Sequence, residues 1–129
     1  SMVLRREARE RKTDLQLMQI GIELLTQYLP EFDTHPASIN WRNMNERWGS
    51  CTTVDKTIRI SDRLVGSPSY VLNYIIFHEL IHLQIPNHDS DFYNYLGRYA
   101  DTAKAEAFLE GFELGCQSSA SAVIPAVNI

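Results

Sequence analysis

Three histidines and a glutamate lie close together near the middle of this 129-residue chain, in the stretch YIIFHELIHLQIPNHDSDF at residues 74–92. His78 and His82 are four residues apart, so an α-helix would place both imidazoles on one face. Two imidazoles at this spacing can occupy two corners of a zinc tetrahedron. Glu79 follows the first histidine, where a carboxylate can accept a proton from a metal-activated water. The pattern therefore predicts a hydrolytic metal centre with Glu79 as general base.

A catalytic zinc site also needs a third protein ligand, and His88 is the candidate. A continuous helix would carry His88 about 9 Å beyond His82 along the axis. Pro86 interrupts the helix between them, and Pro-Asn favours a turn that can bring the chain back. We therefore expect one Zn²⁺ per chain on the three histidines. Cys51 is a weaker candidate ligand, because three histidines already complete a catalytic set.

The motif also allows two interpretations without catalysis: histidines with no metal, and a zinc site that serves only to bind partners. A single buried histidine is usually a core residue with its hydrogen bonds satisfied, and H-E-x-x-H also arises by chance in surface helices. Here the flanking residues are apolar, the glutamate is in place and a third histidine follows a helix break. A non-catalytic zinc module that binds partners is the other interpretation. Such a structural site would have no use for Glu79 and would normally fill its fourth position with protein.

The surrounding pattern predicts a small α+β protein. A long amphipathic helix over residues 4–29 ends before Pro30, and its apolar positions are spaced by three and four residues: Leu15, Met18, Ile22, Leu25 and Leu29. Strand-forming segments at 38–51 and 57–61 predict a small antiparallel sheet. Ser67 as N-cap and Pro68 at the first position start a helix that is apolar on nearly all faces and therefore buried.

Shorter helices should follow this buried helix. One begins near Asp89 or Ser90, and another covers residues 102–114. We expect one domain over residues 1–116 and a flexible tail at 117–129, which has no charge and many small residues. His35 lies far from the motif and is interpreted as a loop residue.

Charge and composition narrow the class of protein. The net charge of −4 and a pI of about 5.5 disfavour a dedicated nucleic-acid binder. No apolar run approaches the roughly 18 residues of a membrane span, and no secretory signal is visible. The two cysteines are far apart, which favours separate reduced thiols and a cytoplasmic location.

Several motifs together resemble those of the YgjP-like metallopeptidases and, more distantly, the SprT/Spartan zinc proteases. They are RWGSC, IRISDRLV, HELIHL and NHDSDFY, and the resemblance covers roughly residues 39–96. It implies a minimal zincin-like domain that hydrolyses peptide bonds of a peptide or protein substrate with zinc. It also offers a DNA-associated, Spartan-like protease as an alternative, against which the acidic pI counts. Tyr93 stands where the family often has tryptophan.

Other residues are candidates for substrate or oxyanion contacts. The segment containing Trp48 and Gly49 allows two interpretations: a strand that borders the cleft and pairs with a peptide, or core packing with a bulge. For the oxyanion, the sequence does not choose among Tyr93, Tyr95 and Arg98. Hydrogen-bond partners for the histidines are sought among Asn73, Asp89 and Asp91.

Overall fold

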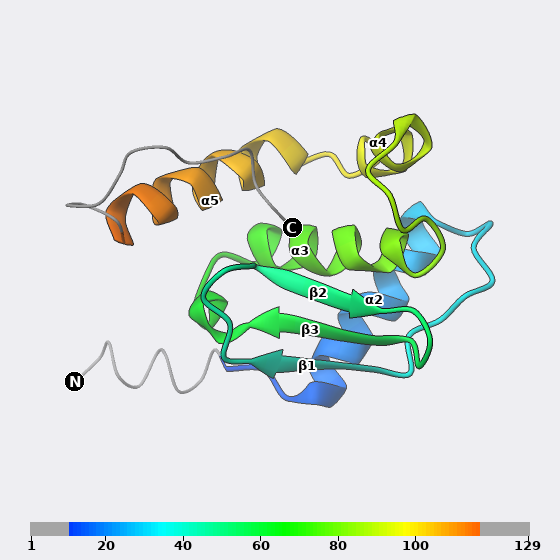
Figure 1. The fold of residues 1–129 in the computed structure, drawn as a ribbon, viewed down its shortest axis with the longest axis horizontal. Helices are drawn as coiled ribbons and strands as arrows, with labels where there is room; N and C mark the ends of the chain where they lie inside the picture. Colours follow the sequence, from blue (N-terminus) through cyan, green and yellow to red (C-terminus); the bar gives the residue numbers. More distant parts are fainter. Residues whose placement is uncertain (1–10, 117–129) are drawn as a thin grey trace.

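The computed structural model describes residues 11–116. Three strands form one sheet in the order β1-β3-β2: β1 (Ser38–Arg42), β2 (Gly49–Thr52) and β3 (Thr57–Ser61). The helices are α2 (Asp14–Tyr28), α3 (Ser69–His82), α4 (Ser90–Leu96) and α5 (Thr102–Cys116), with a 3₁₀ turn η1 (Asp62–Leu64) before α3. The predicted α+β fold class is confirmed (Figure 1).

The sheet is mixed, so the prediction of an antiparallel sheet is wrong for one of its two pairings. β2 and β3 form the expected antiparallel hairpin, but β1 pairs with β3 in parallel, with Ile39 opposite Ile58. The reason is the connection at residues 43–48, which carries the chain past β3 to its far side instead of closing a tight hairpin with β1 (Figure 1). β2 is consequently an edge strand.

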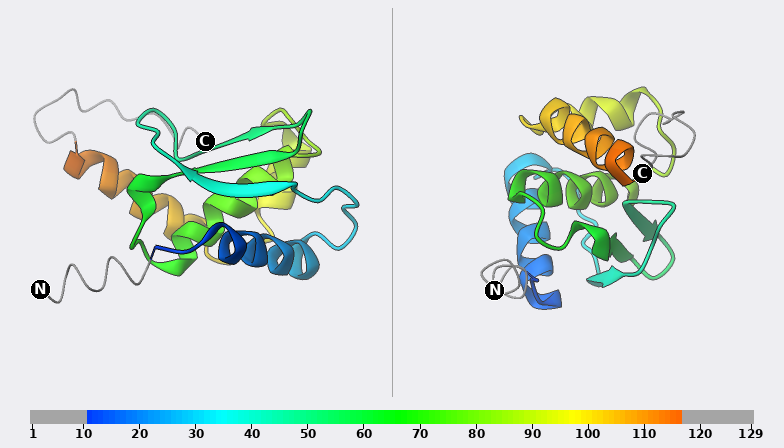
Figure 2. Two further views of the ribbon diagram at one scale, coloured as in Figure 1. Left: turned by 90° about the horizontal axis from the view of Figure 1, so that it is seen from below. Right: turned by 90° about the vertical axis from the view of Figure 1, so that its left-hand side faces the viewer.

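Helices α2 and α3 cover the same face of the sheet (Figure 2). Ile58 and Ile60 of β3 are fully buried on that face. Arg59, which alternates with them, lies among the hydroxyl groups of Ser50, Thr52 and Thr57 and donates hydrogen bonds to all three. Ile58 and Ile60 therefore share the buried side of the strand and Arg59 lies on the other, whereas Ser61 at the end of the strand is also buried.

Helix α2 begins later than predicted, because a capping box fixes its start. The Thr13 hydroxyl accepts from the Gln16 N–H at 3.1 Å, and the Gln16 side chain accepts from the Thr13 N–H at 2.8 Å. Residues 11–13 are not helical, so a continuous helix from residue 4 is wrong; residues 4–10 lie outside the described part.

The predicted apolar stripe of α2 is confirmed in part. Leu25 and Leu29 are buried, and Met18 packs against the core. Leu15 and Ile22 are exposed, and their place on the buried face is taken by Leu17, Gly21 and Leu24. The predicted and the observed buried positions both have helical spacing. The close approach of β1 determines which of these two faces of α2 is buried. A Cβ on Gly21 would lie 2.7 Å from Ile39 Cδ1, so the sheet packs most closely where α2 has no side chain.

Helix α3 is the centre of the molecule and packs against α2, α4, α5 and two strands. Ten of its fourteen residues are buried, which confirms the prediction of a buried helix. Its N-cap is Pro68 and not Ser67, one residue from the prediction, because the Ser67 hydroxyl donates backwards to the Leu64 carbonyl at 2.7 Å.

The chain then ends α3 at His82, turns through Pro86, and starts α4 at Ser90 with Asp89 as its N-cap. Within residues 11–116 no helix is long and apolar enough to cross a membrane. The predicted tail at 117–129 lies outside the described residues. The single-domain boundary at residue 116 stays a prediction.

Candidate active site

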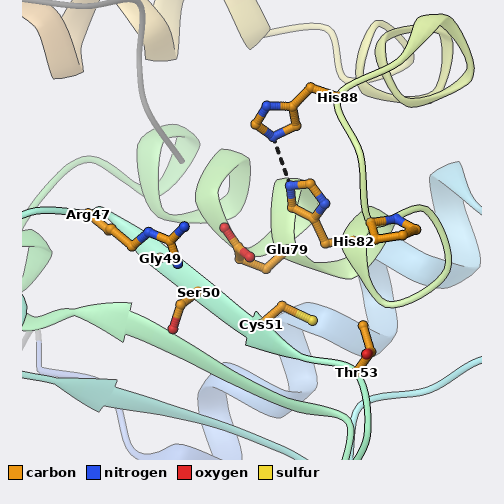
Figure 3. A pocket seen from close by; sticks show the side chains of 9 residues that line it. Arg47, Gly49, Ser50, Cys51, Thr53, Glu79, His82 and His88 are labelled. Carbon is orange, nitrogen blue, oxygen red and sulfur yellow. Dashed lines mark hydrogen bonds between the residues drawn. The ribbon is translucent and has the colours of Figure 1, made fainter.

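The three histidines of the motif converge on one point. His78 and His82 come from consecutive turns of α3. The segment that follows α3 brings His88 back to face His82 (Figure 3). The Nε2 atoms of His82 and His88 are 2.9 Å apart, and one nitrogen from each of the three rings lies within 4.8 Å of the others. The turn predicted from Pro86 therefore brings the distant third histidine to the first two.

The donor set fits a divalent metal ion. Nδ1 of His78 and Oε2 of Glu79 lie 3.4 Å apart and are buried without a hydrogen-bond partner in the described part of the chain. Buried polar atoms are normally paired, so orphaned atoms call for an explanation. Burial, reinforced by the nearby His88, lowers the pKa of His78 to about 3. The neutral imidazole, which is the metal-binding form, is therefore the stable form at neutral pH.

Glu79 lies beside the histidines with only 2% of its surface exposed. Burial raises its pKa to about 7, against the opposing effect of His82 and Arg47. Its carboxylate faces a cleft of about 200 Å³ between β2 and the histidines, into which Arg47 also points (Figure 3). A carboxyl group with a pKa near neutrality and access to a cleft can accept and return a proton.

The hydrogen-bond partner of His82 is a backbone carbonyl. His82 Nδ1 lies 3.0 Å from the Ile85 carbonyl oxygen, which accepts the ring N–H and leaves the Nε2 lone pair directed at the cluster. No sequence signal could have indicated this partner, because any residue at the end of α3 could supply a carbonyl. Of the side chains proposed for this role, Asp89 instead accepts from the Phe92 N–H at 3.0 Å to cap α4. Asp91 and Asn73 make no hydrogen bond to a histidine within residues 11–116.

Gly49 explains how β2 approaches Glu79. A Cβ at this position would lie 2.9 Å from Ile75 Cγ2 and 3.1 Å from Glu79 Oε2. The glycine is therefore needed for contact between β2 and α3, which neither interpretation of RWGSC had included. Trp48 is 3% exposed and packs against Phe112 with the ring centroids 5.2 Å apart, so it belongs to the core and does not line the cleft.

Of the three candidate oxyanion contacts, only Tyr93 lies beside the histidines, with its ring centroid 6.0 Å from that of His88. Tyr95 packs against Phe32, and Arg98 forms a two-pronged ion pair with Glu31 at 2.6 and 2.9 Å. The structure thus does not bring Tyr95 and Arg98 to the site. For Tyr95 the reason is the helical register of α4, which turns position 95 towards Phe32 in the loop after α2 when position 93 faces the histidines.

Two further predictions concern residues outside the histidine cluster. Cys51 lines the cleft but is not part of the cluster, and burial followed by the charge of Glu79 raises its pKa to about 12. A thiol that resists ionisation is a poor metal ligand. His35 lies in the loop between α2 and β1, as predicted. Arg47, the first residue of RWGSC, also lines the cleft; the motif alone does not indicate this position, because it is the packing of β2 on α3 that places Arg47 opposite Glu79.

Comparison with known proteins agrees with this geometry. A family model for the YgjP-like metallopeptidase domain matches residues 4–107. The chain belongs to this family and is a metal-dependent peptidase. A comparison with curated protein sequences gave no significant match.

Two solved structures share the fold. The metallopeptidase zymogen of Methanocaldococcus jannaschii jannalysin is similar with a TM-score of 0.61 and 26% identity, over 81% of this chain and 99% of that one. The metallopeptidase zymogen of Pyrococcus abyssi abylysin gives a TM-score of 0.57 and 17% identity, over 81% and 95% of the two chains. At that identity, the second likeness concerns the fold alone.

Proposed function

We propose that this protein is a zinc-dependent peptidase in which His78, His82 and His88 hold the ion and Glu79 is the general base. The observation that carries the proposal is the convergence of three histidine nitrogens beside a buried carboxylate that faces an open cleft. Three neutral nitrogen donors suit Zn²⁺ and leave a coordination position for the reaction. A bound zinc ion supplies Lewis acidity, which makes both water and the scissile carbonyl more reactive.

The chain's own residues supply the proton transfers and hold the substrate. Glu79 accepts a proton from the attacking water and delivers it to the leaving amine, for which a pKa of about 7 suits both directions. The edge of β2 that no described strand pairs with borders the cleft and offers backbone groups to which an extended peptide can bind. The hydrogen bond to the Ile85 carbonyl holds the His82 ring in place during these steps.

We infer that the substrates are peptides or proteins cleaved in the cytoplasm. The support for this location is indirect: Cys51 is a free thiol, and the sequence carries few cysteines. No feature of the described residues favours a DNA-associated role over a general peptidase.

Replacing the general base tests the proposal. Glu79→Gln keeps the side-chain shape, so the variant should bind the same amount of zinc as the wild type but hydrolyse a fluorogenic peptide library about 10²–10⁴-fold more slowly. Glu23→Gln, which removes the same charge from an exposed position on α2, is the matched control and should behave like the wild type. A Glu79→Gln protein with undiminished turnover would refute the proposed role.

A further inference from the structure

A second cavity adjoins the histidines and lies apart from the Glu79 cleft. Its volume is about 260 Å³, and α3, α4 and α5 form its walls. His88 lines both cavities, so any group in the second cavity lies directly beside the proposed site of hydrolysis. The volume falls below the roughly 300–1,000 Å³ of small-molecule pockets and suits a single side chain.

The cavity carries two carboxylates from α5. Glu106 and Glu110 are four residues apart, which places both on the helix face that lines it. The Tyr74 hydroxyl donates a 2.6 Å hydrogen bond to Glu106 Oε2. Because Tyr74 is 1% exposed and its hydroxyl is neutral, this bond fixes the position of the carboxylate without cancelling its charge.

No cation within residues 11–116 compensates these charges. Lys104, the basic residue of α5, lies over the Tyr70 ring, 4.2 Å from its centroid. Arg63 forms its ion pair with Glu113, which does not line the cavity. Among the described residues, Glu106 and Glu110 therefore direct negative charge into a space beside the histidines without a basic side chain opposite them.

The other walls are apolar or aromatic. Tyr74, Tyr93 and Leu96 line the cavity together with His78, which is 4% exposed. Aromatic and aliphatic walls that lead to carboxylates match a side chain with a long apolar stem and a cationic end. Tyr93, 55% exposed, can also contact the cation through its ring face.

We propose that this cavity selects a lysine or arginine side chain of the substrate, at a position flanking the scissile bond. The inference rests on the proposed peptidase function and adds the class of residue that is recognised. A second metal ion is the competing occupant. Within the described residues, however, only the three histidines form a group of at least three donors close enough to hold an ion.

The first experiment maps cleavage sites in a peptide library by mass spectrometry. For the zinc-loaded wild type we expect lysine and arginine to be enriched at one position flanking the cleaved bond. In Glu106→Gln/Glu110→Gln, the preference for lysine over norleucine at that position should fall about tenfold, as for one lost charge-assisted hydrogen bond. The rate with lysine peptides should fall more than the rate with norleucine peptides. Glu113→Gln removes a charge from the same helix outside the cavity and should keep the preference.

A second experiment measures binding without catalysis. The Glu79→Gln protein should retain basic peptides from the library, and the same protein with Glu106→Gln and Glu110→Gln should not. Glu110→Lys, at an exposed position, is expected to fold and to shift the retained peptides towards acidic side chains.

The outcomes separate this inference from the proposed function. Cleavage without a basic preference, or with a preference that survives the double substitution, would overturn the inference and leave the peptidase function intact. Loss of bound zinc in the double variant would also overturn it, because the carboxylates would then support the metal centre. Absence of any wild-type cleavage would refute the peptidase function, whereas the binding experiment would still decide what the cavity recognises.

Discussion

Gly49→Ala should damage the site without touching a metal ligand. The added Cβ would lie 2.9 Å from Ile75 Cγ2, 3.1 Å from Glu79 Oε2 and 3.2 Å from Glu79 Cγ. Carbon atoms pack favourably at about 3.5–4.0 Å, so β2 and α3 must separate by roughly half an ångström. Ile75 is 0% exposed and cannot move into solvent, and Glu79 can yield only by shifting its carboxylate within the cleft that it faces.

The geometry gives the expected loss of stability and the expected loss of turnover. Overpacking of a core contact costs about 1–3 kcal/mol of unfolding free energy, and each kcal/mol corresponds to about 2–8 °C in Tm. Misplacement of a catalytic group by 1 Å can cost about 10²-fold, so a displacement of half that size should lower turnover about tenfold or more. Zinc content should stay at the wild-type level, because the nearest atoms belong to Ile75 and Glu79 and not to a histidine.

The assays are thermal unfolding, peptide hydrolysis and elemental analysis of the same preparation. Gly111→Ala is the control: its Cβ would meet nothing within 4 Å, and alanine in a helix interior should stabilise α5 by about 0.5–1 kcal/mol. If Gly49→Ala kept both the wild-type Tm and the wild-type turnover, β2 would not hold Glu79 in place and this reasoning would be refuted.

Two further predictions use ionisable groups away from the metal ligands. Burial raises the Cys51 pKa to about 12, so iodoacetamide at pH 7.5 should modify Cys51 at least about 100-fold more slowly than free cysteine. Mass mapping of the Cys51 peptide measures the rate of modification. Labelling at the rate of a free thiol would contradict the prediction. The hydrogen bonds from Arg98 lower the Glu31 pKa from 4.5 to about 2, so the stabilisation from this pair should be complete above about pH 4.5 and lost as the pH falls towards 2. Glu31→Gln should therefore lower Tm at pH 7, and its difference from the wild type should shrink across that window; a constant difference would show that the carboxylate does not titrate as described.

The centre of the site is predictable from the sequence because covalent spacing alone sets much of its geometry. Residues four apart on a helix share a face, so the spacing of His78 and His82 is enough to place their side chains together. Pro86 marks the end of that helix and predicts the return of His88. The buried character of α3 follows from its continuous apolar sequence.

The features that the sequence does not predict depend on contacts between distant segments. The parallel pairing of β1 with β3 depends on where the connection at residues 43–48 crosses the sheet. The buried face of α2 depends on the approach of Ile39 to Gly21. Glu106 comes from α5, well beyond the motif in sequence, and no local pattern connects it with the histidines.

The roles of the candidate contacts are hidden from the sequence for the same reason. Tyr93, Tyr95 and Arg98 all follow His88 closely in sequence, but the register of α4 directs only Tyr93 to it. The packing of Gly49 against the Glu79 side chain is hidden in the same way, because it depends on the contact between β2 and α3.

Metal content of the wild type and of His88→Ala is the most direct test of the central claim that three histidines hold a catalytic ion. Elemental analysis of protein purified without chelator should give about one zinc per chain for the wild type. His88→Ala should bind zinc much more weakly, because two of the three converging nitrogens remain. Equal zinc content and affinity in the two proteins, measured by competition with a chelator, would show that His88 is not a ligand and would contradict the account.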